Sequence, residues 1–102
     1  MEISVEKKEN SIRFTIVGEV DEQGATVLKE KFRSLYTASF TKVSFDFKNV
    51  THIGSAGIGK LLLFYKDVAM NNGTIGIEHI PPGIYELFLT LKLETVFLLS
   101  KS

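Results

Sequence analysis

The chain has 102 residues, of which 44% are hydrophobic and 24% are charged, and this size and composition fit one globular domain over residues 1–102. Its twelve basic and twelve acidic residues cancel to a formal net charge of zero, which argues against nucleic acid or an anionic membrane as a partner. The absence of cysteine excludes disulfides, a thiolate nucleophile and a cysteine-based metal site, and no apolar run reaches the ~18 residues that cross a bilayer.

Alternating apolar residues predict two strands at the beginning of the chain, and a helical pattern follows them. Ile3–Glu6 alternates weakly and predicts a short first strand, whereas Ile12, Phe14 and Ile16 fall on one face of a second. Asp21 stands where the N-cap of the following helix is expected. The apolar residues that recur at helical spacing in this helix are Ala25, Leu28, Phe32, Leu35 and Tyr36.

Two further helices and three further strands complete the prediction. Val43–Phe47 predicts a third strand and Thr74–Glu78 a fourth, and Val96–Leu99 is either a last short strand or the end of the chain. The predicted core face of the second helix consists of Ile58, Leu61, Leu62, Tyr65, Val68 and Ala69. The third helix opens at Pro81-Pro82, since proline suits a first helical turn. Its apolar stripe consists of Ile84, Leu87, Phe88 and Leu91.

The predicted order of elements is β-β-α-β-α-β-α-β. Helices between the later strands imply right-handed parallel crossovers, on a sheet that begins with a hairpin. No internal repeat, linker or low-complexity segment interrupts this order. The sequence therefore predicts one compact α/β domain with a mixed sheet.

The connection between the third strand and the second helix holds a candidate nucleotide-binding motif. Gly54–Lys60 matches the pattern G-x-x-x-x-G-K between a strand and a helix. However, Leu61 stands where that pattern needs a hydroxyl to hold Mg²⁺, and Asp46 lies on the wrong strand to position the metal. A nucleotide-binding module therefore remains only as a lesser alternative.

The same connection places the hydroxyl of Ser55 at or near the N-terminal end of a helix, where free backbone N–H groups and the helix dipole favour negative charge. A phosphate on Ser55 would be tolerated locally and would change any partner surface that docks over it. On chemistry alone, a serine that only caps the helix or turn is slightly favoured over a functional one. The two histidines, His52 and His79, form no recognisable catalytic or metal-binding pattern with it.

A small acidic group, Glu19, Asp21 and Glu22, precedes the first predicted helix. Helix capping and complementarity to the helix dipole are the favoured explanation of these carboxylates. A docking edge for a basic partner surface is the alternative, and the two roles are compatible.

Three segments in order resemble the successive signatures of the STAS domain, which sulfate transporters and anti-sigma factor antagonists share. They are Val17–Asp21, Val43–Val50 and Ile53–Gly59, and the stretch Pro82–Leu93 resembles the third helix and following turn of the family. The resemblance covers nearly the whole chain. It implies a mixed sheet of four or five strands flanked by helices.

The resemblance also implies a function and a mechanism. In stand-alone bacterial members, the serine at the position of Ser55 is phosphorylated by a partner that is both an anti-sigma factor and a serine kinase. The unphosphorylated protein captures this partner, phosphorylation breaks the complex, and a PP2C-type phosphatase restores it. The implied partner-binding residues are Asp21, Gly54, Ser55, Ala56, Gly57, Ile58 and Lys60. A catalytic residue, a metal ion and a cofactor are not expected.

The chain departs from the family pattern at one position that bears on this function. Gly54 stands where the family has an aspartate before the serine, so a carboxylate beside the phosphate acceptor is missing. This difference leaves open weaker or redirected kinase recognition. The family's terminal helix is expected to be absent or very short, because the chain ends soon after the last predicted strand.

The main alternative is a STAS subunit that docks constitutively on an ABC-type transport ATPase, for which Ser55 phosphorylation would be irrelevant. For the antagonist we expect a cytoplasmic protein, since the first residues lack the basic and apolar regions of a signal peptide. We also expect a monomer that exchanges different partners, with no direct membrane insertion.

Overall fold

One five-stranded sheet carries the helices of this chain. The computed structural model describes the backbone of all 102 residues and every side chain except that of residue 37. The strands are β1 (Glu2–Lys8), β2 (Ser11–Val20), β3 (Lys42–Ile53), β4 (Thr74–Ile80) and β5 (Leu98–Lys101). The helices are α1 (Glu22–Arg33), α2 (Ser55–Met70) and α3 (Pro82–Thr90), with short 3-10 helices η1 (Thr37–Ser39) and η2 (Leu93–Thr95).

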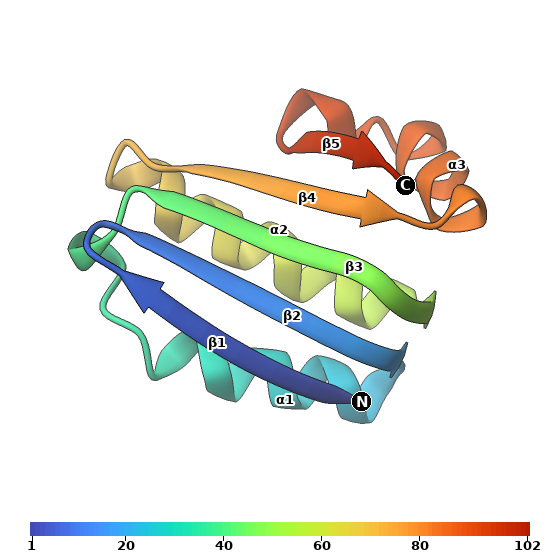
Figure 1. Cartoon of the computed structure of the whole chain (residues 1–102), viewed down its shortest axis with the longest axis horizontal. Coiled ribbons are helices and arrows are strands. Elements are labelled where there is room, and N and C mark those ends of the chain that lie inside the picture. Colours follow the sequence, from blue (N-terminus) through green and yellow to red (C-terminus); the bar gives the residue numbers. More distant parts are fainter.

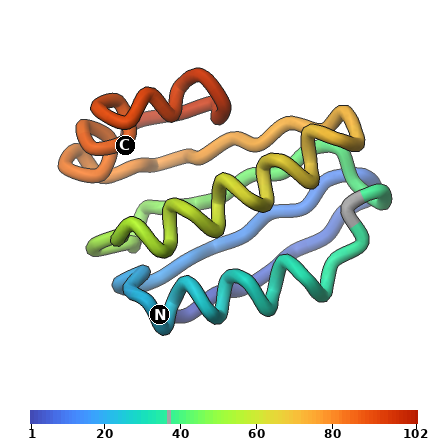
Figure 2. The backbone as a smooth tube through the Cα atoms, turned by 180° about the vertical axis from the view of Figure 1, so that it is seen from behind, coloured from blue at the N-terminus to red at the C-terminus, as the bar shows by residue number. Residues whose placement is uncertain are grey.

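The sheet has the strand order β1-β2-β3-β4-β5, with β1 antiparallel to β2 and every later pair of neighbours parallel. This order confirms the predicted mixed α/β fold. Each parallel crossover steps to the next strand in the same direction, so right-handed connections place the helices on one face. Figures 1 and 2 show α1 and α2 side by side across that face, whereas α3 lies near β5. Phe88 of α3 packs against Phe47 of β3, with ring centroids 6.0 Å apart.

The centre of the core is an aromatic cluster between the sheet and helices α1 and α2. Phe14 of β2 stacks on Phe45 of β3, with ring centroids 4.7 Å apart. Phe32 of α1 stacks on Phe64 of α2 at 4.0 Å, and each ring of this pair meets each ring of the first edge-on. Because such ring pairs prefer defined geometries, the cluster fixes how both helices lie on the sheet.

The sheet face opposite to this core is polar, with Arg13 at its centre. The Nη1 atom of Arg13 donates to Oε1 of Glu78 at 2.8 Å and to the hydroxyl of Ser44 at 3.1 Å, and Nη2 lies 3.5 Å from Oδ2 of Asp46. The hydrogen bond to Glu78 is the main cause that raises the pKa of Arg13 above its ordinary value. The guanidinium therefore stays charged and links strands β2, β3 and β4.

Strands β1 to β4 are longer than the alternation of apolar residues predicts. Strand β3 continues from Phe47 to Ile53, although its pairing with β2 shifts register twice. At the first shift, Oδ1 of Asp46 accepts a hydrogen bond from the backbone N–H of Lys48 at 3.0 Å. The bulge breaks the period of two, which explains why the prediction stopped at Phe47. At the other end of the chain, β5 begins at Leu98, two residues later than predicted.

The buried face of α2 differs from the predicted face at one decisive position. Phe64 is only 2% exposed, whereas Leu62, which was predicted to lie in the core, is 36% exposed. Residues 61–64 are all apolar, so a helical period can be drawn through them in two registers. The aromatic cluster selects the register in which Phe64 points inward.

Four other apolar residues were also misplaced by the helical pattern. Leu35 and Tyr36 lie beyond α1, which ends at Arg33. Ser34 caps this helix, and its hydroxyl donates a hydrogen bond to the carbonyl oxygen of Lys31 at 2.6 Å. In the third helix, the predicted core residues Leu87 and Leu91 are exposed, whereas Ile84 and Phe88 are buried. The short helix α3 therefore buries a narrower stripe than its apolar sequence suggests.

Positions 62 and 64 of α2 allow a matched test of the assigned buried face. Phe64→Ala removes a buried ring that stacks on Phe32, so we expect the free energy of unfolding to fall by about 3–5 kcal/mol. Leu62→Ala truncates a partly exposed side chain and should cost under about 1 kcal/mol. Urea unfolding followed by circular dichroism measures both values, and equal losses in the two variants would contradict this helix register.

Candidate functional site

Three helices begin at the same edge of the sheet. Strands β2, β3 and β4 end at Val20, Ile53 and Ile80, and helices α1, α2 and α3 start two residues after each of these ends. Because the three strands are parallel, their carboxyl ends lie together, as Figure 1 shows. This edge therefore collects the N-terminal ends of three helices, where backbone N–H groups lack partners within the helix.

Ser55 is the first residue of α2 and lies exposed at this edge. The N-cap position belongs to Gly54, whose extended backbone has φ −96° and ψ 176° and which supplies no capping side chain. The Ser55 hydroxyl forms no hydrogen bond with any residue that the structure describes. Ser55 is thus not the cap of α2, and the interpretation of this serine as a cap is wrong. Its hydroxyl lies in a helical first turn, where the dipole favours an added negative charge.

Asp21 is the N-cap of α1, as predicted, and stands next to the start of α2. Its Oδ1 atom accepts a hydrogen bond from the backbone N–H of Gly24 at 2.8 Å. The residue before it, Val20, accepts a hydrogen bond from the N–H of Gly54 at 3.0 Å through its carbonyl oxygen. This backbone contact joins the beginnings of α1 and α2, so that the carboxylate and Ser55 belong to one surface.

Gly57 allows the first turn of α2 to lie directly on the sheet. A Cβ atom at this position would lie 2.6 Å from Cγ1 of Val20 and 3.2 Å from Cγ1 of Ile53, and real contacts are essentially never as short as 2.6 Å. Ile58 is buried beside it. Gly57 and Ile58 therefore support the loop from beneath. The other predicted site residues are accessible, namely Asp21, Gly54, Ser55, Ala56 and Lys60.

Two exposed leucines extend this surface, and the sequence pattern had placed both in the core. Leu62 lies seven residues after Ser55, so the two share one side of α2. Leu87, which is 37% exposed, belongs to α3. It lines a shallow hollow of about 300 Å³ together with Thr51, His52, Ile53, Pro81, Gly83 and Ile84. Their exposure gives the edge an apolar component that a partner protein would bury.

The geometry does not favour the nucleotide-binding alternative. Leu61 is completely buried, so no hydroxyl is available at that position for Mg²⁺. Lys60 lines a groove between α1 and α2. The strand order also runs β2-β3-β4-β5 without reversal, whereas nucleotide-binding crevices form where the order of parallel strands reverses.

His52, three residues before Ser55, is the histidine nearest to it in the sequence. It is exposed, and among the residues that the structure describes it forms no hydrogen bond with Ser55. The described residues include no group of three histidine, cysteine, aspartate or glutamate side chains placed to hold a metal ion. None of the helices described has the length and apolar character needed to cross a membrane.

Comparison with known proteins gives consistent matches over most of the chain. The STAS domain model matches residues 2–102. The chain is 29% identical over 86 residues to the anti-sigma-B factor antagonist of Bacillus subtilis (strain 168), a match that covers 84% of this chain and 78% of that protein.

Two solved structures share its fold. An anti-sigma factor antagonist from Mycobacterium paratuberculosis has a TM-score of 0.84 at 21% identity, covering 99% of this chain and 86% of the other. The Bacillus cell fate determinant SpoIIAA in its phosphorylated form has a TM-score of 0.77 at 14% identity, and the match covers 99% of this chain and 93% of that one.

The contact beneath the loop can be tested with two glycines of α2. Gly57→Ala should lower the free energy of unfolding by about 1–3 kcal/mol, because its methyl group overlaps Val20. Gly59→Ala is the matched control, since nothing lies within 4 Å of its added Cβ. There we expect a gain of about 0.5–1 kcal/mol from the better helix propensity of alanine. Thermal and urea unfolding measure both, and a stable Gly57→Ala variant would contradict the described packing.

Proposed function

The chain belongs to the STAS domain family, and on that premise we propose that it is an anti-sigma factor antagonist whose partner binding is switched off by phosphorylation of Ser55. The observation that carries this proposal is the exposed Ser55 hydroxyl at the first position of α2, free of hydrogen bonds with the described residues. A kinase can reach such a hydroxyl without unfolding the site. The name of the Bacillus subtilis relative supports the same role.

The surface around Ser55 suits a reversible protein contact. It combines exposed Leu62 and Leu87 with the Asp21 carboxylate, so a partner would bury apolar area and meet a local negative charge. A phosphoserine adds a charge of about −1.5 to −2, which must be desolvated when a partner docks over it. A loss of ~2.8 kcal/mol in binding would already weaken the complex about 100-fold.

The proposed partners are an anti-sigma factor that is also a serine kinase and a PP2C-type phosphatase that removes the phosphate. The contact surface consists of Asp21, Gly54, Ser55, Ala56 and Lys60, supported from beneath by Gly57 and Ile58. In this role the chain is the substrate of an enzyme and needs no catalytic group of its own. It would act in the cytoplasm as a monomer between partners.

Gly54 favours one rival function, constitutive docking on an ABC-type transport ATPase. The family aspartate is missing beside the phosphate acceptor, as expected if phosphorylation no longer matters. The same loop and α2 would then hold the partner regardless of the state of Ser55.

Capture from the native host compares the two functions directly. Tagged Ser55→Ala should retain the anti-sigma partner, whereas Ser55→Asp should lose it at least tenfold, because a carboxylate replaces the hydroxyl in the contact. Bound proteins are identified and quantified by mass spectrometry.

Both variants must first show the wild-type unfolding midpoint, since Ser55 is exposed and neither change should disturb the fold. Equal capture of an ABC-type ATPase by both variants would contradict the switch and support the rival. Leu62→Ala serves as a further control: it should weaken capture while leaving Ser55 intact.

The missing aspartate can be restored as Gly54→Asp. The nearest atom to an added Cβ is the Val20 carbonyl oxygen at 3.9 Å, so the side chain has room, and its carboxylate can cap α2. We expect the free energy of unfolding to rise by about 0.3 kcal/mol. We also expect the captured kinase to phosphorylate Ser55 faster, measured by mass spectrometry over a time course. An unchanged rate would mean that this kinase does not use the carboxylate.

A further inference from the structure

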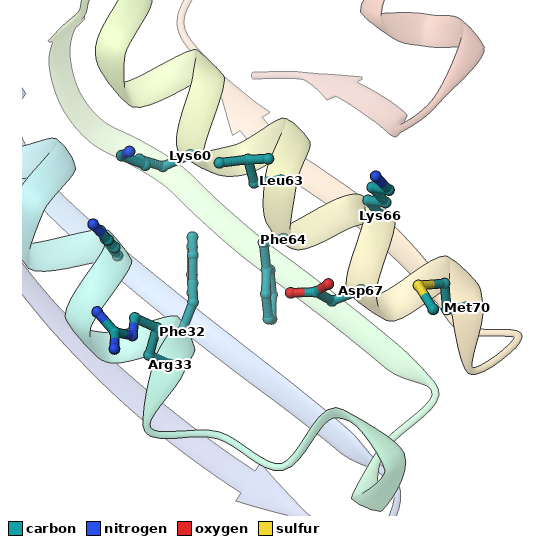
Figure 3. Close-up of a pocket in the computed structure, with 9 residues that line it drawn as sticks. Phe32, Arg33, Lys60, Leu63, Phe64, Lys66, Asp67 and Met70 are labelled. Carbon is teal, nitrogen blue, oxygen red and sulfur yellow. The ribbon is translucent and has the colours of Figure 1, made fainter.

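A groove lies between α1 and α2, along the side of α2 that carries Leu63. Its volume is about 570 Å³, and its lining includes Lys60, Leu63 and Met70 from α2 and Lys29 and Arg33 from α1. Figure 3 shows Lys60, Leu63 and Met70 along α2, with Arg33 on α1. The lined stretch of α2 spans residues 60–70, which corresponds to ~15 Å of helix. The groove therefore extends along α2.

The floor of the groove is apolar and rigid. Phe32 and Phe64 form it, and their rings stack 4.0 Å apart with an interplanar angle of 7°. Leu63 and Met70 also line the groove, with 60% and 76% of their surfaces exposed. These two residues are seven apart, so they lie two turns apart on one side of α2. The apolar floor and these two exposed side chains together make the groove a candidate surface for a partner.

The rim of the groove is positively charged. Lys29, Arg33, Lys60 and Lys66 line it with one carboxylate, Asp67, so four positive charges and one negative charge leave a local excess of three. The whole chain has a formal net charge of zero, so this excess is a local feature. None of the four cations forms an ion pair or side-chain hydrogen bond with the described part of the chain. Their charges are available to a ligand.

We propose that this groove binds an amphipathic helix of a partner protein, with leucine-like residues on one face and carboxylates along its flanks. An apolar groove between two helices is a common receptor for such a segment. The two exposed residues Leu63 and Met70 match apolar anchors spaced seven residues apart on the incoming helix. The cations on both sides of the groove match several separate carboxylates.

The distribution of charge favours a helix over a small amphiphile. A fatty acid carries one carboxylate and would leave most of the four cations unpaired. Small-molecule pockets also enclose most of their ligand, whereas Leu63 and Met70 leave this groove open along its length. The proposal goes beyond the Ser55 switch, because it concerns the groove between α1 and α2 and needs no phosphorylation, although Lys60 borders both surfaces.

A designed acidic peptide is the probe. It has about 14 residues, with leucines at the first, fourth, eighth and eleventh positions of its apolar face and glutamates on both flanks. A peptide of the same composition in permuted order is its control. Titration into ¹⁵N-labelled protein should shift the amide signals of residues 29–33 and 60–70 in a saturable manner. The permuted peptide should shift them at least tenfold more weakly.

Charge-reversal variants locate the binding. Lys29→Glu combined with Arg33→Glu should lower the affinity for the peptide at least tenfold. Raising the salt concentration from about 0.05 to 0.5 M should also lower this affinity. Lys8→Glu combined with Lys42→Glu makes the same change in net charge at exposed positions outside the groove, and should leave the affinity within twofold. Circular dichroism confirms that both double variants are folded.

Several outcomes would overturn the proposal. They are no saturable binding at millimolar peptide, equal binding of the permuted peptide, shifts confined to other elements, or equal weakening by the two double variants. Saturable binding of laurate that displaces the peptide would assign the groove to a lipid-like acid instead. The experiment uses neither a kinase nor an anti-sigma factor, so its failure is distinguishable from failure of the Ser55 switch.

Discussion

The close approach of the first turn of α2 to the ends of β2 and β3 is the contact on which the candidate site depends. Gly57 has no Cβ, and this leaves room for the side chains of Val20 and Ile53 directly beneath the helix. The hydrogen bond from Gly54 to the carbonyl of Val20 closes the same contact from the backbone. Together they fix Ser55 at the surface beside the start of α1. A larger residue at position 57 would have to lift the helix and move the hydroxyl.

The topology explains why this edge presents a surface and not a deep crevice. The parallel strands follow one another in sequence order, so successive helix N-termini lie in a row and no reversal opens a gap between them. A row of helix ends with exposed leucines suits contact with another protein. A phosphate on Ser55 would act on that contact through charge repulsion and through the cost of desolvating the phosphate.

Helix α2 has more apolar residues than the core can bury, and this excess gives it two candidate binding sides. Of the four apolar residues 61–64, Leu61 and Phe64 point into the core, while Leu62 and Leu63 remain exposed on different sides. Leu62 shares its side with Ser55, and Leu63 borders the positively charged groove.

The sequence by itself determined the class of fold, the order of the elements and the position of Ser55 near a helix N-terminus. Alternation in β2, the Asp21 cap and the glycines after β3 are local features, and local rules are sufficient for them. The extent of β3 and the inward turn of Phe64 were decided only by tertiary structure. The bulge at Asp46 depends on pairing with β2, and Phe64 is selected by rings that come from three other elements. The groove likewise exists only because two helices distant in sequence lie side by side, and no pattern within either helix encodes that meeting.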